Sequence, residues 1–253
     1  MNGYIASLCA VFVCLNLAPD SRAADSNGNI IVNNGGGVTI AVDSKVNTGI
    51  DLGDGAGKNI LKGNGDIKTE ARNLEKFKAI KISGAFDVFS QKGDRANVKI
   101  TCDSNLLPHI LSKISNGELS ITPDSQLSCR NKIKIEICTT GEVNKIEVSG
   151  ACATVFKDMA AASLLLSLDG TSSAVLSGKV DTFEVDMGGA CSLKADDLKT
   201  KVTSVSVAGT GKADVFASEK LTAEISGLGT VNYYGDPKDI VKDISGLGRL
   251  NKK

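Results

Sequence analysis

A repeat of about 19 residues organises the second half of the chain. Six glycines that each follow a short alternating segment are spaced by 20, 19, 20, 18 and 19 residues. They are Gly150, Gly170, Gly189, Gly209, Gly227 and Gly246. A period of this length, kept over six units, is typical of solenoid proteins, in which each unit packs on the next.

The residues before these glycines alternate in polarity. The positions two and four before each glycine are apolar in eleven cases out of twelve, and the exception, Lys242, lies in the last unit. The positions between them are polar: Glu147, Ser167, Asp186, Ser206, Glu224 and Asp243. This alternation predicts β-strands with one face turned inward and the other turned to water.

A second ladder of small residues lies two positions after each glycine. Its members are Cys152, Ser172, Cys191, Gly211, Gly229 and Gly248. Small side chains at equivalent turns are what stacked units require, so the sequence predicts an all-β fold, a parallel β-helix (solenoid) turned by glycine. A propeller blade needs about twice this period, and no leucine-rich pattern recurs. Because Cys152 and Cys191 would lie two rungs and about 9.6 Å apart, they are not expected to form a disulfide.

The preceding region continues the pattern less regularly. The segment 82–89 around Gly84 matches 148–156, and alternating strands are expected at 97–101, 118–122 and 132–137. Residues 105–115 carry leucine and isoleucine at helical spacing, with Pro108 in the first turn, and they predict one short helix. His109, the single histidine, is expected on its surface.

The first residues have the pattern of a targeting segment. An apolar run at 5–18 is followed by Ser21-Arg22-Ala23, which predicts a signal peptide over 1–23 and an exported protein that is periplasmic, on the outer surface or secreted. No later run is long enough to span a membrane. Residues 24–61 form a glycine-rich leader, either a flexible arm or extra edge strands, and the β-helical domain is expected over 62–251.

Composition restricts the chemistry. The chain has 29 Lys and Arg against 29 Asp and Glu, which argues against a nucleic-acid partner. A single histidine cannot build a histidine-rich zinc site. Signal cleavage would leave five cysteines, an odd number whose pairing stays open: Cys102, Cys129, Cys138, Cys152 and Cys191.

The acidic residues do not form a convincing catalytic pair. Asp169 and Asp186 flank strands near turns, and Asp196 and Asp197 are neighbours that would point to opposite faces of a strand. The run 51–57 lacks the spacing of a calcium loop. We therefore expect no catalytic residue, no metal and no cofactor, and we assign a structural turn role to Gly84, Gly150, Gly170, Gly189, Gly209, Gly227 and Gly246.

Three stretches resemble a known family. The opening from Lys62-Gly-Asn-Gly-Asp66 through Phe77 to Ile80-Lys-Ile-Ser-Gly84, and the close Ser226-Gly-Leu-Gly229 with Ser245-Gly-Leu-Gly248, are similar to the putative auto-transporter adhesin head GIN domain family. Asn105-Leu-Leu-Pro-His-Ile110 resembles its short helix. The resemblance covers about residues 62–251 and implies a right-handed parallel β-helical domain on secreted or envelope proteins, with no established activity to carry over.

Three functions remain open at this stage. The favoured one is a non-enzymatic, adhesin-like binding module whose rigid polar surface meets a carbohydrate or a protein at a cell surface. The second is a structural protein, since exposed end strands allow a homo-oligomer or filament, although Lys242, Lys252 and Lys253 would protect the end. The third is a carbohydrate-active β-helix enzyme, which would need a cluster of acidic and basic side chains on one face.

Overall fold

The computed structural model describes residues 22–24, 30–33, 38–40, 51–52 and 60–253. The chain divides into two compact units, residues 1–58 and 59–253. In the first unit, four short strands pair antiparallel in chain order: β1 (Arg22–Ala24), β2 (Ile30–Asn33), β3 (Val38–Ile40) and β4 (Asp51–Leu52). The rest of the predicted signal peptide and most of the predicted leader lie outside the described residues.

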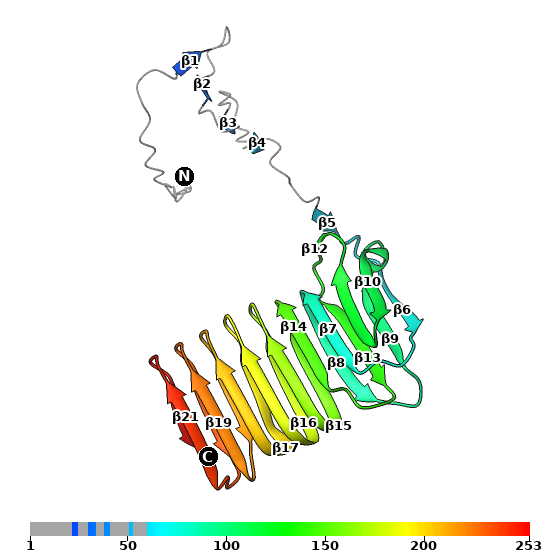
Figure 1. The fold of residues 1–253 in the computed structure, drawn as a ribbon. Coiled ribbons are helices and arrows are strands. Elements are labelled where there is room, and N and C mark those ends of the chain that lie inside the picture. Colours follow the sequence, from blue (N-terminus) through cyan, green and yellow to red (C-terminus); the bar gives the residue numbers. More distant parts are fainter. Residues whose placement is uncertain (1–21, 25–29, 34–37, 41–50, 53–59) are drawn as a thin grey trace, which may run out of the picture. The chain divides into compact units, whose positions relative to one another are not determined.

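The second unit is all-β, as the sequence predicts. Its long strands are β15 (Ala153–Leu168), β16 (Ser173–Met187) and β17 (Ser192–Val207), and each pairs in parallel with the next repeat. In the later repeats the same course is divided between shorter strands: β18 (Lys212–Phe216), β19 (Lys220–Ile225), β20 (Thr230–Tyr234), β21 (Asp239–Ile244) and β22 (Arg249–Lys252). Figure 1 shows these strands side by side in the order of the sequence.

Each repeat contributes a segment to two faces. Residues before the glycine, such as 163–168 and 182–187, pair on what we call the pre-glycine face, together with β14 (Lys145–Gly150), β19 and β21. Residues after the glycine, such as 153–156 and 173–175, pair on the post-glycine face with β18, β20 and β22. A register shift between Phe156 and Met159 marks the bend from one face to the other.

The glycines lie directly above one another. From Gly150 to Gly227, the amide after each repeat glycine donates a hydrogen bond to the carbonyl oxygen of the glycine one repeat earlier, as from Thr171 to Gly150 and from Ala190 to Gly170, both 2.8 Å. A Cβ on Gly170 would lie less than 3.0 Å from the carbonyl oxygen of Gly150. Backbone at this spacing leaves no room for a side chain.

The turn residues after the glycines are buried and hydrogen-bonded. Ser172 Oγ donates to the carbonyl oxygen of Asp169 at 2.9 Å, and Cys191 Sγ lies 2.9 Å from that of Gly188. Burial raises the pKa of the Cys152 and Cys191 thiols, which therefore stay protonated as donors. Ser172 lies between Cys152 and Cys191 in the stack of turns, as the repeat predicts. All five described cysteines are thiols that form no disulfide.

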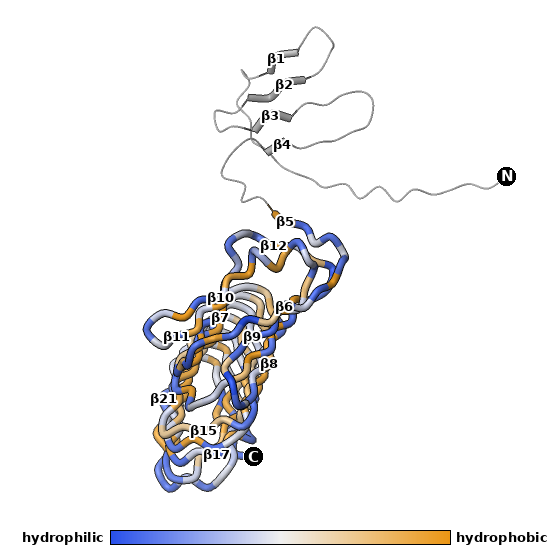
Figure 2. Tube along the Cα trace, turned by 90° about the vertical axis from the view of Figure 1, so that its right-hand side faces the viewer, coloured by the Kyte–Doolittle hydropathy of each residue, from blue (hydrophilic) through white to orange (hydrophobic). Residues whose placement is uncertain are grey.

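The core lies between the two faces. The residues two before the glycines are at most 2% exposed in the inner repeats: Val148, Leu168, Met187, Val207 and Ile225. The largest buried side chains, Phe86, Phe156 and Phe183, fill the interior. Figure 2 shows hydrophobic and hydrophilic positions alternating along the strands, as expected for strands with one buried and one wet side.

The stack begins with strands from the first half of the unit. β7 (Ala79–Gly84) pairs with β14, and β8 (Phe86–Lys92) pairs with β15, both in parallel. On the other side of β8 lie β13 (Ile133–Thr139), β9 (Asn97–Asp103) and β6 (Ile67–Asn73), of which β9 runs antiparallel to both neighbours. A small two-stranded sheet joins β5 (Ile60–Lys62) and β12 (Gln126–Ser128).

The predicted helix at 105–115 is wrong. Only Leu107–His109 form a single 3-10 turn, with Pro108 near its start, and Ile110–Ser115 form β10. β10 pairs antiparallel with β11 (Glu118–Pro123) around Asn116 and Gly117, whose φ angles are 51° and 75°. An Asn-Gly pair with both φ values positive is the preferred two-residue hairpin turn, and it overrides the helical spacing of the leucines and isoleucines.

Both strands of the last repeat carry a lysine where earlier repeats are apolar. Lys242 on β21 pairs in register with Ala223, which is fully buried, and Lys252 on β22 pairs with Tyr233, which is 9% exposed. The neighbouring core positions on β21, Ile240 and Ile244, are 42% and 37% exposed, whereas their register partners on β19, Leu221 and Ile225, are buried. Charged side chains at inward positions of an edge are a recognised means of preventing further strand pairing.

Candidate functional site

An apolar stripe crosses three neighbouring strands on the outer side of the post-glycine face. It consists of Phe89 on β8, Val155 on β15 and Val175 on β16, which pair directly in register. Val175 is 39% exposed. The positions that extend the stripe are charged, with Glu136 before Phe89 and Lys194 after Val175. Apolar side chains on three successive outward positions are unusual on a face that otherwise meets water.

The stripe borders a hollow of about 450 Å³. Ala153 and Ser173 are small and lie on the same face, so the surface is recessed beside the valines. Its rim carries Asp87, Lys134 and Glu136. A second hollow of about 290 Å³ shares Asp87, Ala153 and Ser173 with the first and extends toward the glycine turns. The volume lies in the range of ordinary ligand pockets.

The charges around this hollow are unevenly paired. Lys132 forms an ion pair with Asp87 at 3.1 Å, and Lys99 lies directly across from Glu136 on β9. The ammonium of Lys157 lies over the ring of Phe89, 5.4 Å from its centroid. Lys134, Lys157 and Lys194 have no carboxylate oxygen within 4.0 Å among the described residues. The rim therefore keeps an excess of positive charge although the whole chain is neutral.

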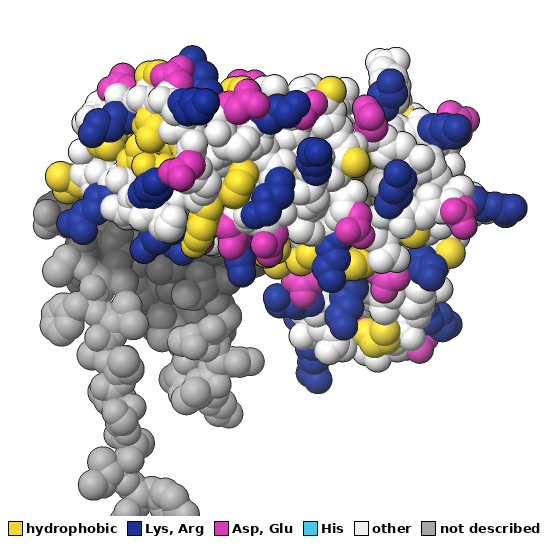
Figure 3. Space-filling view, turned by 90° about the horizontal axis from the view of Figure 1, so that it is seen from below, with side chains coloured by type: hydrophobic (Ala, Val, Ile, Leu, Met, Phe, Trp, Pro, Cys, Tyr) yellow, Lys and Arg dark blue, Asp and Glu magenta, His cyan; other side chains and the backbone are white. Residues whose placement is uncertain are grey.

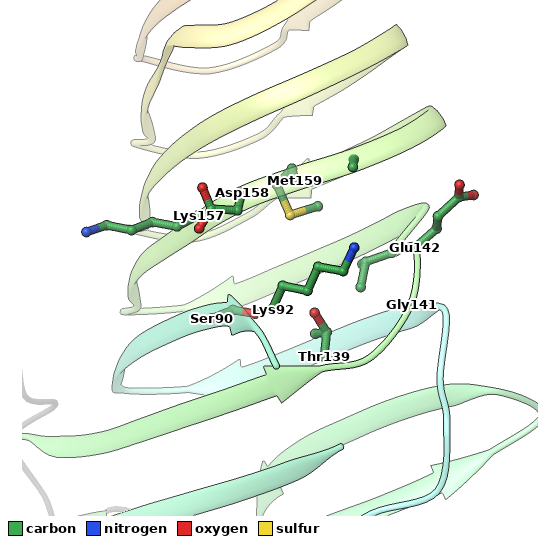
Figure 4. A pocket seen from close by; sticks show the side chains of 10 residues that line it. Ser90, Lys92, Thr139, Gly141, Glu142, Lys157, Asp158 and Met159 are labelled. Atoms are coloured by element: carbon green, nitrogen blue, oxygen red, sulfur yellow. The ribbon is translucent and has the colours of Figure 1, made fainter. Parts of the chain in front are cut away.

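A smaller cavity of about 160 Å³ lies at the bend after β8 and β13. Ser90 and Thr139 are buried in its wall, and Lys92 extends across it, whereas Lys157 and Glu142 point away (Figure 4). Asp158 has a φ of 55° here, which a non-glycine residue rarely adopts. Lys157, directly before Asp158, has its ammonium over the ring of Phe89 rather than in this cavity.

The pre-glycine face is polar, and its first strands carry a cluster of ion pairs around Glu147. Glu147 accepts from Lys145 at 2.5 Å and from Lys81 at 2.9 Å, and these contacts lower the pKa of its carboxyl. The other outward residues predicted there continue the ladder: Glu184, Asp186, Ser204, Ser206, Thr222 and Glu224. Figure 3 likewise shows a surface on which both signs of charge are interspersed among small hydrophobic patches.

The carboxylates that the sequence singled out do not converge. Asp186 pairs in register with Ser167 and Ser206, and Asp169 lies against the position where a Cβ of Gly188 would be. Asp196 and Asp197 are neighbours beside a register shift of β17. His109 Nδ1 lies 3.0 Å from Asp124 at the surface, which helps to lower the pKa of that carboxyl after the larger effect of Ser125.

No metal site is built from the part of the chain that the structure describes, since no three His, Cys, Asp or Glu side chains gather there. The run 51–57, which lacks the spacing of a calcium loop, lies mostly outside the described residues, because 53–57 are not among them. Within the described ranges, no helix is long and apolar enough to cross a membrane.

The seven glycines predicted at turns lie on the edge that joins the two faces. Gly84, Gly150, Gly170 and Gly189 have φ values between 74° and 144°. Gly209, Gly227 and Gly246 instead lack space, since a Cβ on each would meet the preceding glycine's carbonyl oxygen at less than 3.0 Å. None of the seven lines the apolar stripe or its hollow.

Sequence reasoning missed this hollow. It assigned the polar surface to the pre-glycine face and gave Phe89 and Val155 no role. The available signal was that valine and phenylalanine occupy outward positions at 89, 155 and 175, but recognising it requires the register of β8 against β15, which are separated by an excursion of the chain through 93–144.

The sequence model of one family, described as "Putative auto-transporter adhesin, head GIN domain", matches residues 76–237. This chain belongs to that family. The match includes the stripe, its rim and most of the stacked repeats. Among curated proteins, no match was found.

Solved structures share the fold. The chain is similar to a putative adhesin from Bacteroides fragilis, with a TM-score of 0.63 and 17% identity, covering 76% of this chain and 100% of that one. It is also similar to a putative adhesin from Parabacteroides distasonis, with a TM-score of 0.50 and 19% identity, covering 77% of this chain and 100% of that one. At this identity the likeness concerns the fold alone.

Proposed function

We propose that this head GIN domain protein is an exported, non-enzymatic, adhesin-like binding module that meets its partner through the post-glycine face. The observation that carries the proposal is the hollow beside Phe89, Val155 and Val175, an apolar recess on an otherwise polar stack. Membership of a family of putative adhesins supports the same reading. The partner is a protein or a carbohydrate at a cell surface.

We further infer that the stacked repeats wind as a right-handed parallel β-helix. Consecutive repeats pair in parallel on both faces, and crossovers between parallel strands are right-handed in nearly all known cases. Export follows from the predicted signal peptide over 1–23 and is consistent with the family, and the final compartment would be the periplasm, the outer surface or the medium.

The other two functions have less support. Self-assembly through this end of the stack would bury the charge of Lys242 and the ion pair of Lys252 with Asp236, and both are costly to remove from water. A carbohydrate-active enzyme would need facing carboxylates, whereas the predicted candidates Asp169 and Asp186 lie on a face whose best-placed acid, Glu147, is paired with two lysines.

The test is a binding screen of the purified exported protein on a glycan array and on whole cells, with product analysis of every hit. The expected result is saturable binding without turnover. Turnover of a bound glycan would replace the proposal with the enzyme. An absence of binding to all sugars and cell surfaces would overturn the adhesin-like function.

A further inference from the structure

The apolar stripe has the dimensions of a short peptide contact. Phe89, Val155 and Val175 lie on three adjacent strands, so the stripe is about 10 Å long, twice the spacing between strands. It runs across the strands rather than along them. Two side chains on the same side of an extended peptide are about 7 Å apart, so a pair of aliphatic side chains fits within the stripe.

The lysines at the rim favour a peptide with acidic residues on both sides of its apolar centre. Lys134 stands beside the hollow at one end, Lys194 follows Val175 at the other, and Lys157 lies over Phe89. The described residues supply no carboxylate oxygen within 4.0 Å of any of these three lysines. Among the acids nearby, Asp87 pairs with Lys132 at 3.1 Å, and Glu136 lies across from Lys99 in register. Asp214 lies across from Lys194 in register, but its ion pair is with Lys212, at 2.7 Å. A ligand with carboxylates on both sides of an apolar centre is complementary to this arrangement.

The same observations disfavour a neutral carbohydrate. Sugars are commonly held by an open aromatic ring together with uncharged polar groups, and Phe89 is the only aromatic residue that lines the hollow. The ammonium of Lys157 occupies one side of its ring. The remaining floor is valine, alanine and serine, with free lysines at the edge. Of the two partner classes, the hollow fits the protein better.

We propose that the hollow binds an extended acidic segment of a partner protein, with two aliphatic side chains on the stripe and flanking carboxylates on Lys134, Lys157 and Lys194. This inference rests on the proposed binding function and names the partner class of the same face. The aliphatic contacts supply most of the affinity, and the lysines supply orientation and the rate of association.

The experiment is an NMR titration of the isotope-labelled full chain with the acetylated, amidated peptide Glu-Asp-Val-Ser-Val-Asp-Glu, because amide shifts detect weak binding and locate it. Saturable shifts are expected for the amides of Phe89, Val155 and Val175. The same peptide with lysine at the acidic positions, the peptide with serine in place of both valines, and a neutral linear oligosaccharide should produce no saturable shifts there.

Two pairs of variants test the assignment. Val175→Asp should weaken the peptide by about tenfold or more, since it places a carboxylate in the stripe. The matched control, Thr230→Asp, adds the same charge on the same face at β20 and should bind like wild type. Lys134→Glu should also weaken binding and reduce its salt dependence, whereas Lys179→Glu, the same charge reversal away from the hollow, should not.

The outcomes separate this inference from the function on which it rests. Absence of saturable shifts, equal binding of the lysine-substituted peptide, or shifts at the stripe caused by the oligosaccharide would each overturn the acidic-peptide assignment. If such a protein still binds cells in the screen, the binding module stands and its partner class changes. If the peptide binds at the stripe but cells are not bound, the adhesin-like function fails while the peptide site remains.

Discussion

The tight stacking of the glycine turns predicts a stability loss that can be divided into two causes. Gly189 combines a φ of 74° with backbone crowding, since a Cβ there would lie less than 3.0 Å from the carbonyl oxygen of Gly170. Two other glycines carry one cause each. Gly117 has a φ of 75° with nothing within 4 Å of its Cβ position, and Gly209 has the crowding against Gly189 without a positive φ.

The expected magnitudes follow from these differences. Gly117→Ala should lower the free energy of unfolding by about 1–2 kcal/mol, the cost of a left-handed non-glycine residue. Gly209→Ala should cost about 1–3 kcal/mol for overpacking, and about 1 kcal/mol more if the 2.8 Å hydrogen bond from Thr210 to Gly189 is lost. Gly189→Ala should combine both, about 2–5 kcal/mol, a large fraction of a typical domain's stability.

The assay is urea unfolding of the three variants and wild type, compared at a common slope. The loss of unfolded-chain entropy from glycine to alanine is shared by all three and cancels in the comparison. The order expected is Gly189→Ala as the most destabilised, with the other two nearer to wild type. If Gly189→Ala loses no more than Gly117→Ala, and Gly209→Ala loses nothing, the backbones are not packed as closely as described and the reasoning fails.

Three further predictions concern the ends, the acid stability and the thiols. Replacing both inward lysines, Lys242→Ile with Lys252→Leu, should cause concentration-dependent association in sedimentation analysis, and a variant that stays monomeric at all concentrations would contradict their protective role. The pKa of the Glu147 carboxyl is held below its usual value of 4.5, so the ionised form stabilises the fold above pH 4.5, and this stability is lost as the pH falls. Glu147→Gln should therefore flatten the dependence of the urea midpoint on pH between 3 and 5, and an unchanged slope would refute this. Burial, and to a lesser extent the nearby charge of Asp103, raises the pKa of the Cys102 thiol to about 11. Iodoacetamide at pH 8, followed by peptide mass spectrometry, should therefore show modification of the half-buried Cys138 before that of Cys102, and the reverse order would refute the assignment.

The stacked repeats could be predicted from the sequence because every repeat has the same pattern of apolar, polar and glycine positions. Apolar residues two and four before each glycine, with polar residues between, define inward and outward positions without knowledge of the register. The small residues at Cys152, Ser172 and Cys191 then align the repeats. Lys242 is the exception to the pattern, and it lies on β21, the outermost strand of the pre-glycine face in the described stack.

The irregular part could not be read in the same way. Helical spacing at 105–115 and the Asn116-Gly117 turn gave conflicting local signals, and the pairing of β10 with β11 decided between them. The hollow depends on contacts between segments far apart in the chain. Phe89 and Val155 become neighbours only because β8 and β15 pair across the excursion through residues 93–144, a long-range contact that periodicity does not encode.

The most direct test of the account compares whole-cell binding of three proteins: wild type, Val175→Asp and Thr230→Asp. The two variants add the same charge to the same face, one within the stripe and one outside it. The account predicts saturable binding for wild type and Thr230→Asp and a loss of about tenfold or more for Val175→Asp. Equal binding by all three proteins would contradict the claim that this face carries the function.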